Sequence, residues 1–156
     1  FRGNKYSAFE GGTAVPLVIS WPRKIKGGMV SKALVSHIDL LSSLGSLVQA
    51  RFPKGSAPDS RDYLPTLLGK DLKGRNYVIG QSNTHVLSVL TAQYRYIEPS
   101  NGPKMIQWGP KIETGNLPVP QLYDMTVSPF ESKNVADEHP NEVSRMQLIL
   151  KEERNR

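Results

Sequence analysis

The hydrophobic period of this chain changes near Gly74, and that change constrains the fold more than any other feature. Before Gly74, apolar residues recur at helical spacing or form one short continuous run. After it they recur at about every second residue, which is typical of strands with one buried face. The sequence therefore predicts an α/β piece over residues 1–74, followed over residues 75–156 by a small antiparallel sheet with one closing helix.

Three elements are expected before Gly74. Residues 14–21 are apolar and rich in β-branched side chains, which favours a strand buried on both faces of a sheet. A helix can begin at Ser36 or Asp39, because either side chain can cap it. A short helical turn is expected to be entered through Pro65.

The part of the sequence after Gly74 is predicted to consist mainly of short strands. The expected strands are residues 76–81, 86–92, 94–98 and 122–124. Residues 99–120 are rich in proline and glycine, so they are predicted to be a long surface excursion. Residues 140–156 carry apolar side chains at helical spacing behind Pro140, which indicates an amphipathic closing helix.

Composition excludes several classes of function. No apolar run approaches the ~18–20 residues that a membrane span needs, so no membrane partner is expected. The chain lacks cysteine, which excludes disulfides, thiolate metal sites and a cysteine nucleophile. Its net charge of +6 is concentrated in residues 1–32, but no aromatic-interleaved patch or recognition helix accompanies it. Nucleic acid is therefore not an expected partner, and a solvated basic rim remains the simpler interpretation.

The histidines do not form a metal site in the sequence. No pair lies at i, i+4 on one helix, and there is no H-E-x-x-H motif. His37, beside a helix start, is interpreted as structural, and His139, before a proline, as facing solvent. His85 closes the polar turn 81–85 between two expected strands; it is either part of a plain hairpin turn or a substrate contact.

Residues 2–12, together with Val15-Pro16 and Trp21-Pro22, resemble a block that sulfatases carry, RGGKG-[ST]-x-[WY]-EGG-x-R-VP followed by WPG. Three further segments match sulfatase motifs in the right order: residues 35–41, residues 59–70 and residues 122–136. The chain is thus similar to the C-terminal portion of a sulfatase. The departures from the family pattern are Asn4, Tyr6, Ala14, Arg23, Ser42-Ser43 and Ser128.

The resemblance implies an alkaline-phosphatase-like fold in which residues 1–74 are the C-terminal part of the α/β core. It implies that Lys5 is the catalytic lysine that contacts the sulfate, and that His85 is a possible sugar contact. Seen alone, Lys5 would be an ordinary exposed lysine. Glu10, ahead of the glycine pair Gly11-Gly12, is interpreted as structural, holding the lysine loop against the sheet.

The resemblance also implies what the chain lacks. The family nucleophile is a formylglycine made within a C/S-x-P-x-R motif, and a divalent cation, usually calcium, assists it. Neither that motif nor the metal ligands occur here. They are expected on a missing N-terminal part of the same protein, so this fragment should be inactive alone. The substrate implied is a sulfate ester, of a sugar or an aryl group, and the family location is periplasmic or secreted.

Two alternatives stay open. The same fold could serve a hydrolase of phosphate mono- or diesters or of phosphonates. The segment could instead act as a non-catalytic module that binds anionic glycans through its basic end.

Overall fold

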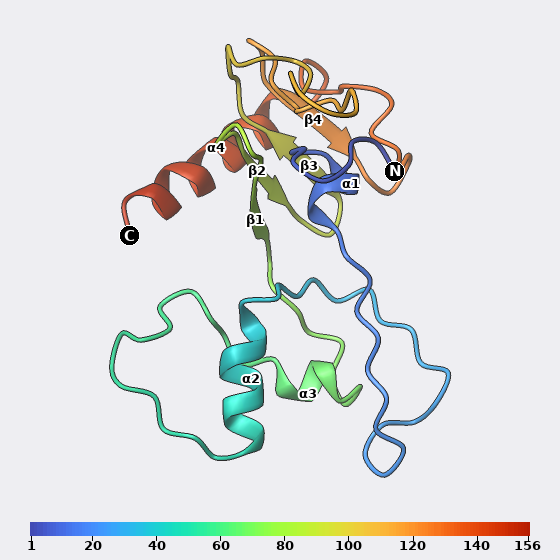
Figure 1. The fold of residues 1–156 in the computed structure, drawn as a ribbon, viewed down its shortest axis with the longest axis vertical. Coiled ribbons are helices and arrows are strands. Elements are labelled where there is room, and N and C mark those ends of the chain that lie inside the picture. The colour runs from blue at the N-terminus through green and yellow to red at the C-terminus, as the bar shows by residue number, and fades with distance from the viewer. The chain divides into compact units, whose positions relative to one another are not determined.

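A computed structural model describes residues 1–156 and divides them into two compact units. One unit combines Phe1–Val15 with Ile79–Arg156, and the other is Pro16–Val78 (Figure 1). The first fifteen residues therefore pack with the C-terminal sheet. The expected division at residue 74, into a core piece and a subdomain, stays a prediction about the whole protein. None of the helices has the length and apolar character needed to cross a membrane.

The first unit is built on a four-stranded sheet. Its strands are β1 (Val78–Gln81), β2 (Leu87–Leu90), β3 (Tyr94–Ile97) and β4 (Gln121–Asp124), in the order β1-β2-β3-β4. The pairs β2/β3 and β3/β4 are antiparallel, and Tyr96 lies opposite both Val89 and Leu122. The predicted strands and the antiparallel sheet are therefore confirmed.

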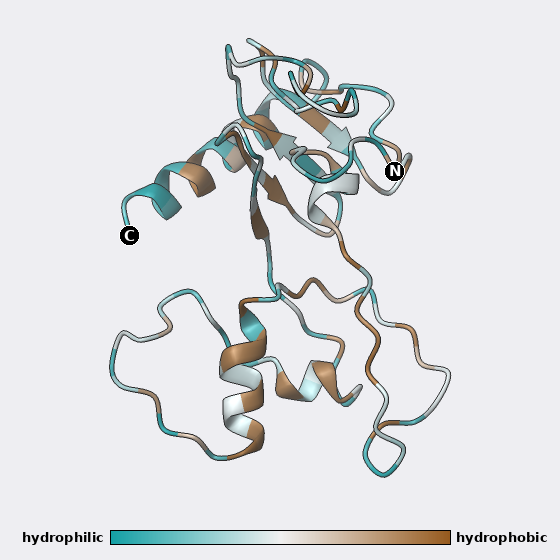
Figure 2. Cartoon of the chain, in the orientation of Figure 1, coloured by the Kyte–Doolittle hydropathy of each residue, from teal (hydrophilic) through white to brown (hydrophobic).

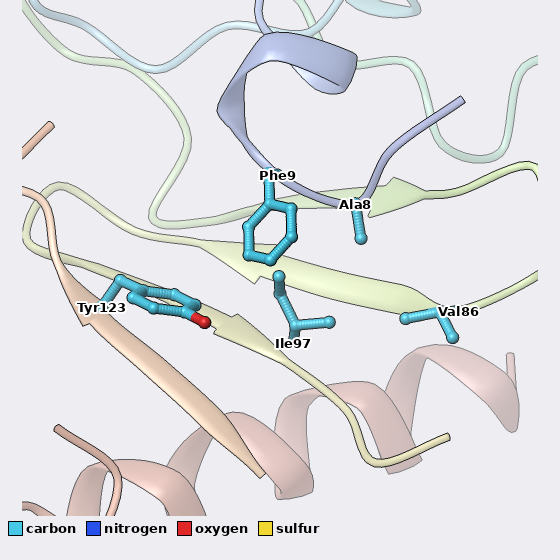
Figure 3. Close-up of a cluster of buried hydrophobic side chains, with 5 residues drawn as sticks. All are labelled: Ala8, Phe9, Val86, Ile97 and Tyr123. Atoms are coloured by element: carbon cyan, nitrogen blue, oxygen red, sulfur yellow. The ribbon is translucent and has the colours of Figure 1, made fainter. Parts of the chain in front are cut away.

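Both faces of β3 are covered, because two different segments pack on it. The helix α4 (Pro140–Arg154) contacts the sheet, and Gln147 hydrogen-bonds the Tyr96 hydroxyl from that side. On the other face, the N-terminal segment contributes to a buried apolar cluster (Figure 3). The members of the cluster are Ala8, Phe9, Val86, Ile97 and Tyr123. The sheet therefore fixes residues 7–9, which begin two positions after Lys5.

The second unit contains α2 (Asp39–Leu47) and α3 (Leu64–Leu67), as the sequence predicts. Its buried polar centre is Asp39, which is 1% exposed. The Arg75 guanidinium donates to both carboxylate oxygens of Asp39, at 2.7 and 2.5 Å. The backbone N–H groups of Ser36 and Arg61 donate to the same carboxylate at 3.0 Å. Burial alone would raise the pKa of Asp39, but these hydrogen bonds together lower it.

The expected strand over residues 14–21 is wrong for this chain. These residues form no strand and pair with no other segment, and Val15 and Val18 are 78% and 89% exposed. Figure 2 shows this run as an apolar stretch of coil. A strand buried in a sheet needs neighbours on both sides to pair its backbone groups, and this chain supplies none there.

Two smaller expectations also need correction. The segment 99–120 is not wholly on the surface, because Ile106, Thr114 and Asn116 in it are buried. His139 does not simply face solvent, since its ring is half-buried 5.6 Å from the ring of Tyr94. In both cases packing against the sheet outweighs the local preference of turn residues for solvent.

Candidate functional site

Lys5 occupies a tight turn over residues 4–7. The turn is closed by a hydrogen bond from the Ser7 N–H to the Asn4 carbonyl at 2.9 Å. The Lys5 N–H donates to the Asn4 side-chain oxygen at 2.8 Å. Tyr6 has a φ of +85°, the left-handed conformation that a type II turn requires at this position. Lys5 is exposed, and its ammonium lies 5.1 Å from the centroid of the Tyr6 ring.

The glycine pair Gly11-Gly12 lets the backbone fold back onto this turn. The Gly11 N–H donates to the Arg2 carbonyl at 2.8 Å. A Cβ on Gly11 would lie 2.6 Å from the Gly3 carbonyl oxygen, and one on Gly12 would overlap the Ser7 carbonyl oxygen. Neither glycine has positive φ, so they are needed for close approach rather than for a special backbone conformation.

A buried ionic network holds the segment after Lys5 on the sheet. Arg95 of β3 is 1% exposed and pairs with the Glu10 carboxylate of α1 (Glu10–Thr13). Its Nε also lies 2.9 Å from Glu131 Oε1, in ion-pair contact without the alignment of a hydrogen bond. Burial raises the pKa of Glu131, although the Glu10 N–H and the Arg95 charge oppose that rise. Glu10 therefore has the structural position that the sequence analysis expects.

A second ion pair ties the start of the chain to the segment 105–113. The Arg2 guanidinium donates to both Glu113 carboxylate oxygens, at 2.8 and 2.9 Å. These hydrogen bonds lower the pKa of Glu113 and raise the pKa of Arg2. Arg2 also lies over the Phe9 ring, with its guanidinium carbon 4.0 Å from the centroid. The turn that carries Lys5 is therefore fixed on both sides.

His85 closes a three-residue hairpin loop between β1 and β2. The His85 N–H donates to the Ser82 carbonyl at 3.1 Å, and His85 has a φ of +65°. This geometry is the usual form of such a loop, in which a type I turn is followed by a left-handed residue. The His85 side chain is exposed, while the Asn83 N–H donates to the Tyr6 carbonyl at 3.0 Å. The structure therefore brings the Lys5 turn and the His85 turn together through their backbones.

The aromatic tip of the segment 105–113 is a third component of the site, which the sequence patterns did not predict. Met105 and Glu113 form an isolated antiparallel bridge, so this segment is a small hairpin. Trp108 near its tip is 56% exposed, and its ring lies edge-on to the Tyr6 ring at 5.1 Å between centroids. A tryptophan among glycine and proline residues was the available signal. Only the fold shows that it meets Tyr6.

Neither a metal site nor a described cavity coincides with Lys5. No group of three or more His, Asp or Glu side chains is arranged to hold a metal ion. One cavity of about 220 Å³ lies beside Tyr123, Glu131 and His139. Another of about 330 Å³ lies beside α4, near Tyr96 and Arg154. Lys5 and His85 line neither of them, and both side chains are exposed.

Comparison with known proteins gives the class. The family profile described as Sulfatase matches residues 1–50. A solved structure described in connection with glycosaminoglycan metabolism by Bacteroides thetaiotaomicron aligns with 100% of this chain and 32% of its own. The TM-score is 0.95 and the sequence identity 42%. The chain corresponds to the C-terminal portion of a sulfatase, with the alkaline-phosphatase-like fold of that region.

Two curated sulfatases are similar to this chain over nearly all of its length. An N-acetylgalactosamine-6-O-sulfatase of Bacteroides thetaiotaomicron is 42% identical over 156 residues, which are 100% of this chain and 30% of that protein. An ulvan-active sulfatase of Formosa agariphila is 29% identical over 95% of this chain and 34% of its own length. The chain therefore spans about a third of the length of these relatives.

Proposed function

We propose that this chain belongs to an enzyme that hydrolyses a sulfate ester of a sugar, and that Lys5 contacts the sulfate. The observation that carries the proposal is the Lys5 turn. It presents an exposed ammonium on a backbone fixed by Gly11, Gly12 and the sheet. The sulfatase resemblance of residues 1–50 supports it.

The chemistry of the ester explains the role of the lysine. Hydrolysis breaks the S–O bond to the sugar and adds water, which yields an alcohol, a sulfate dianion and a proton. Negative charge grows on the leaving oxygen as that bond breaks. An ammonium held near the sulfate stabilises this charge more in the transition state than in the bound substrate. A fixed turn lowers the cost of orienting it.

Other parts of the reaction would come from outside this chain. Its side chains form no cluster able to hold a divalent cation, and its sequence has no C/S-x-P-x-R motif. Calcium and the formylglycine, which the resemblance implies, would therefore be held by other residues of the same protein. On this proposal the isolated chain hydrolyses no sulfate ester. A periplasmic or secreted location remains a family expectation.

The proposed substrate is N-acetylgalactosamine 6-sulfate. The support is the relative named N-acetylgalactosamine-6-O-sulfatase, which is 42% identical over this chain. The exposed His85 side chain is proposed as a sugar contact. Its turn is tied to the Lys5 turn by the hydrogen bond from Asn83 to Tyr6.

The test is sulfate release by the whole protein that carries this chain. Lys5→Ala is expected to lower kcat/KM for the sulfated sugar by about 10²–10³, because one fixed donor to the developing charge is lost. Lys24→Ala is the matched control, since Lys24 is another exposed lysine near the start of the chain. It should leave kcat/KM unchanged.

Two results would contradict the proposal. A Lys5→Ala enzyme with unchanged kcat/KM would remove Lys5 from the mechanism. A whole protein that hydrolyses the matching phosphate ester but no sulfate ester would move it to another class within the same fold.

A further inference from the structure

Tyr6 and Trp108 form an aromatic pair beside Lys5. Their rings meet edge-on, with 5.1 Å between centroids and 67° between planes. The Lys5 ammonium lies 5.1 Å from the centroid of the Tyr6 ring on the same turn. The Tyr6 ring therefore contacts both the Lys5 ammonium and the exposed indole of Trp108.

The aromatic pair is held in place rather than loosely attached. The turn that carries Tyr6 is fixed by the left-handed conformation of Tyr6 and by the hydrogen bond from the Asn83 N–H to the Tyr6 carbonyl. The bidentate pair between Arg2 and Glu113 fixes the base of the hairpin that carries Trp108. Beside Trp108, a Cβ added to Gly109 would meet no atom within 4 Å, and Trp108 itself is 56% exposed.

Trp108 is exposed next to a second aromatic ring and a cation, and aromatic side chains with a few placed polar groups are typical of ligand sites. One face of a pyranose ring presents aliphatic C–H groups, and an aromatic ring buries that face without using its hydroxyl groups. A sulfate on the exocyclic carbon of the same sugar would then project beyond the ring. The arrangement of an apolar platform with one adjacent cation suits a sulfated sugar better than a bare anion.

We infer that Trp108, backed by Tyr6, is the stacking platform for the sugar ring whose sulfate Lys5 contacts. The inference rests on the proposed function and adds a residue that sets the preference for saccharides. Stacking on the ring is the same in the bound substrate and in the transition state. It should therefore act on substrate binding and not on the chemical step.

The experiment uses the whole protein, with N-acetylgalactosamine 6-sulfate as substrate and inorganic sulfate as competitive inhibitor. Trp108→Ala is expected to raise KM by about tenfold, since roughly one sugar face of apolar area is no longer buried. The kcat should stay within about twofold, and the inhibition constant of inorganic sulfate should not change. Lys5→Ala, in contrast, should weaken inhibition by inorganic sulfate.

Two further variants control for the fold. Trp108→Phe keeps an aromatic face and should retain most of the affinity for the sugar. Phe130→Ala removes another aromatic side chain of the same unit, which is 62% exposed. It should change neither the KM for the sugar nor the inhibition constant of inorganic sulfate.

The outcomes separate the two proposals. An unchanged KM in Trp108→Ala, or an equal loss of sugar and inorganic sulfate binding, would overturn the platform while sulfate hydrolysis stands. A fall in kcat with unchanged KM would also overturn it. If the unmodified protein released no sulfate from any ester, the proposed function would fail, and the platform with it.

Discussion

Tyr6 and His85 are non-glycine residues with left-handed backbones, at φ of +85° and +65°, in two turns joined by one hydrogen bond. Such a conformation costs a residue with a Cβ roughly 1–2 kcal/mol. Strain of this kind is kept where the surrounding structure imposes it, and it concentrates at functional sites. Here it places Lys5 at the tip of one turn and His85 at the end of the other.

Gly12 offers a direct test of the close approach beneath Lys5. Gly12→Ala would force a methyl group against the Ser7 carbonyl, which is backbone and cannot rotate away. The free energy of unfolding is expected to fall by about 1–3 kcal/mol. Equilibrium urea unfolding measures it. Gly27→Ala is the control, because Gly27 has no atom within 4 Å of the added position, and an equal effect there would contradict the assignment.

The hairpin over residues 105–113 is joined to the start of the chain by a surface ion pair. Glu113 is held by Arg2, and its pKa is lowered below the ordinary 4.5. Its stabilising contribution is thus fully present above pH 4.5 and is lost as the pH falls through the lower pKa of the folded state. The pair is half exposed, so its effect on stability is modest and decreases with salt.

Glu113→Gln is expected to reduce the acid sensitivity of the protein. Thermal unfolding would be compared at about pH 6.5 and about pH 3.5 in both forms. The variant should be less stable than the unmodified protein at the higher pH and nearly equal to it at the lower one. The same difference at both pH values would show that Glu113 acts through packing and not through its charge.

The first unit is held together by Arg95, which links the N-terminal segment, β3 and the loop of Glu131. Arg95→Met would leave two carboxylates facing each other, one of them with a fully buried side chain. The expected loss in unfolding free energy is about 3–5 kcal/mol near neutral pH. Because burial already raises the pKa of Glu131, protonation at acid pH should remove the unpaired charge, and the loss should shrink there.

Urea unfolding of Arg95→Met at two pH values checks this. Arg145→Met is the matched control, since Arg145 makes an exposed i,i+3 pair with Glu142 on α4. That variant should stay within about 0.5 kcal/mol of the unmodified protein. A loss that is independent of pH would mean that Arg95 contributes packing alone.

Local patterns were enough to predict the antiparallel strands, the helix after Asp39, the turn at Pro65 and the closing helix, because each depends on nearby side chains. The sulfatase block was likewise readable, since it is a contiguous run of residues with a glycine pair. The apolar run 14–21 misled the prediction, because pairing in a sheet needs strands that this chain does not place beside it. Local sequence cannot reveal such missing neighbours.

Only the tertiary structure decided the surroundings of Lys5. Arg2 and Glu113 are 111 residues apart in the sequence. Asp39 and Arg75, which pair in the other unit, are 36 residues apart. No periodicity in the sequence connects either pair. Trp108 contacts Tyr6 because the hairpin folds back over the N-terminal turn. The run of glycine and proline residues in the hairpin does not predict that contact. Contacts of this kind arise from burial and charge pairing between distant segments, so they appear only once the sheet has brought those segments together.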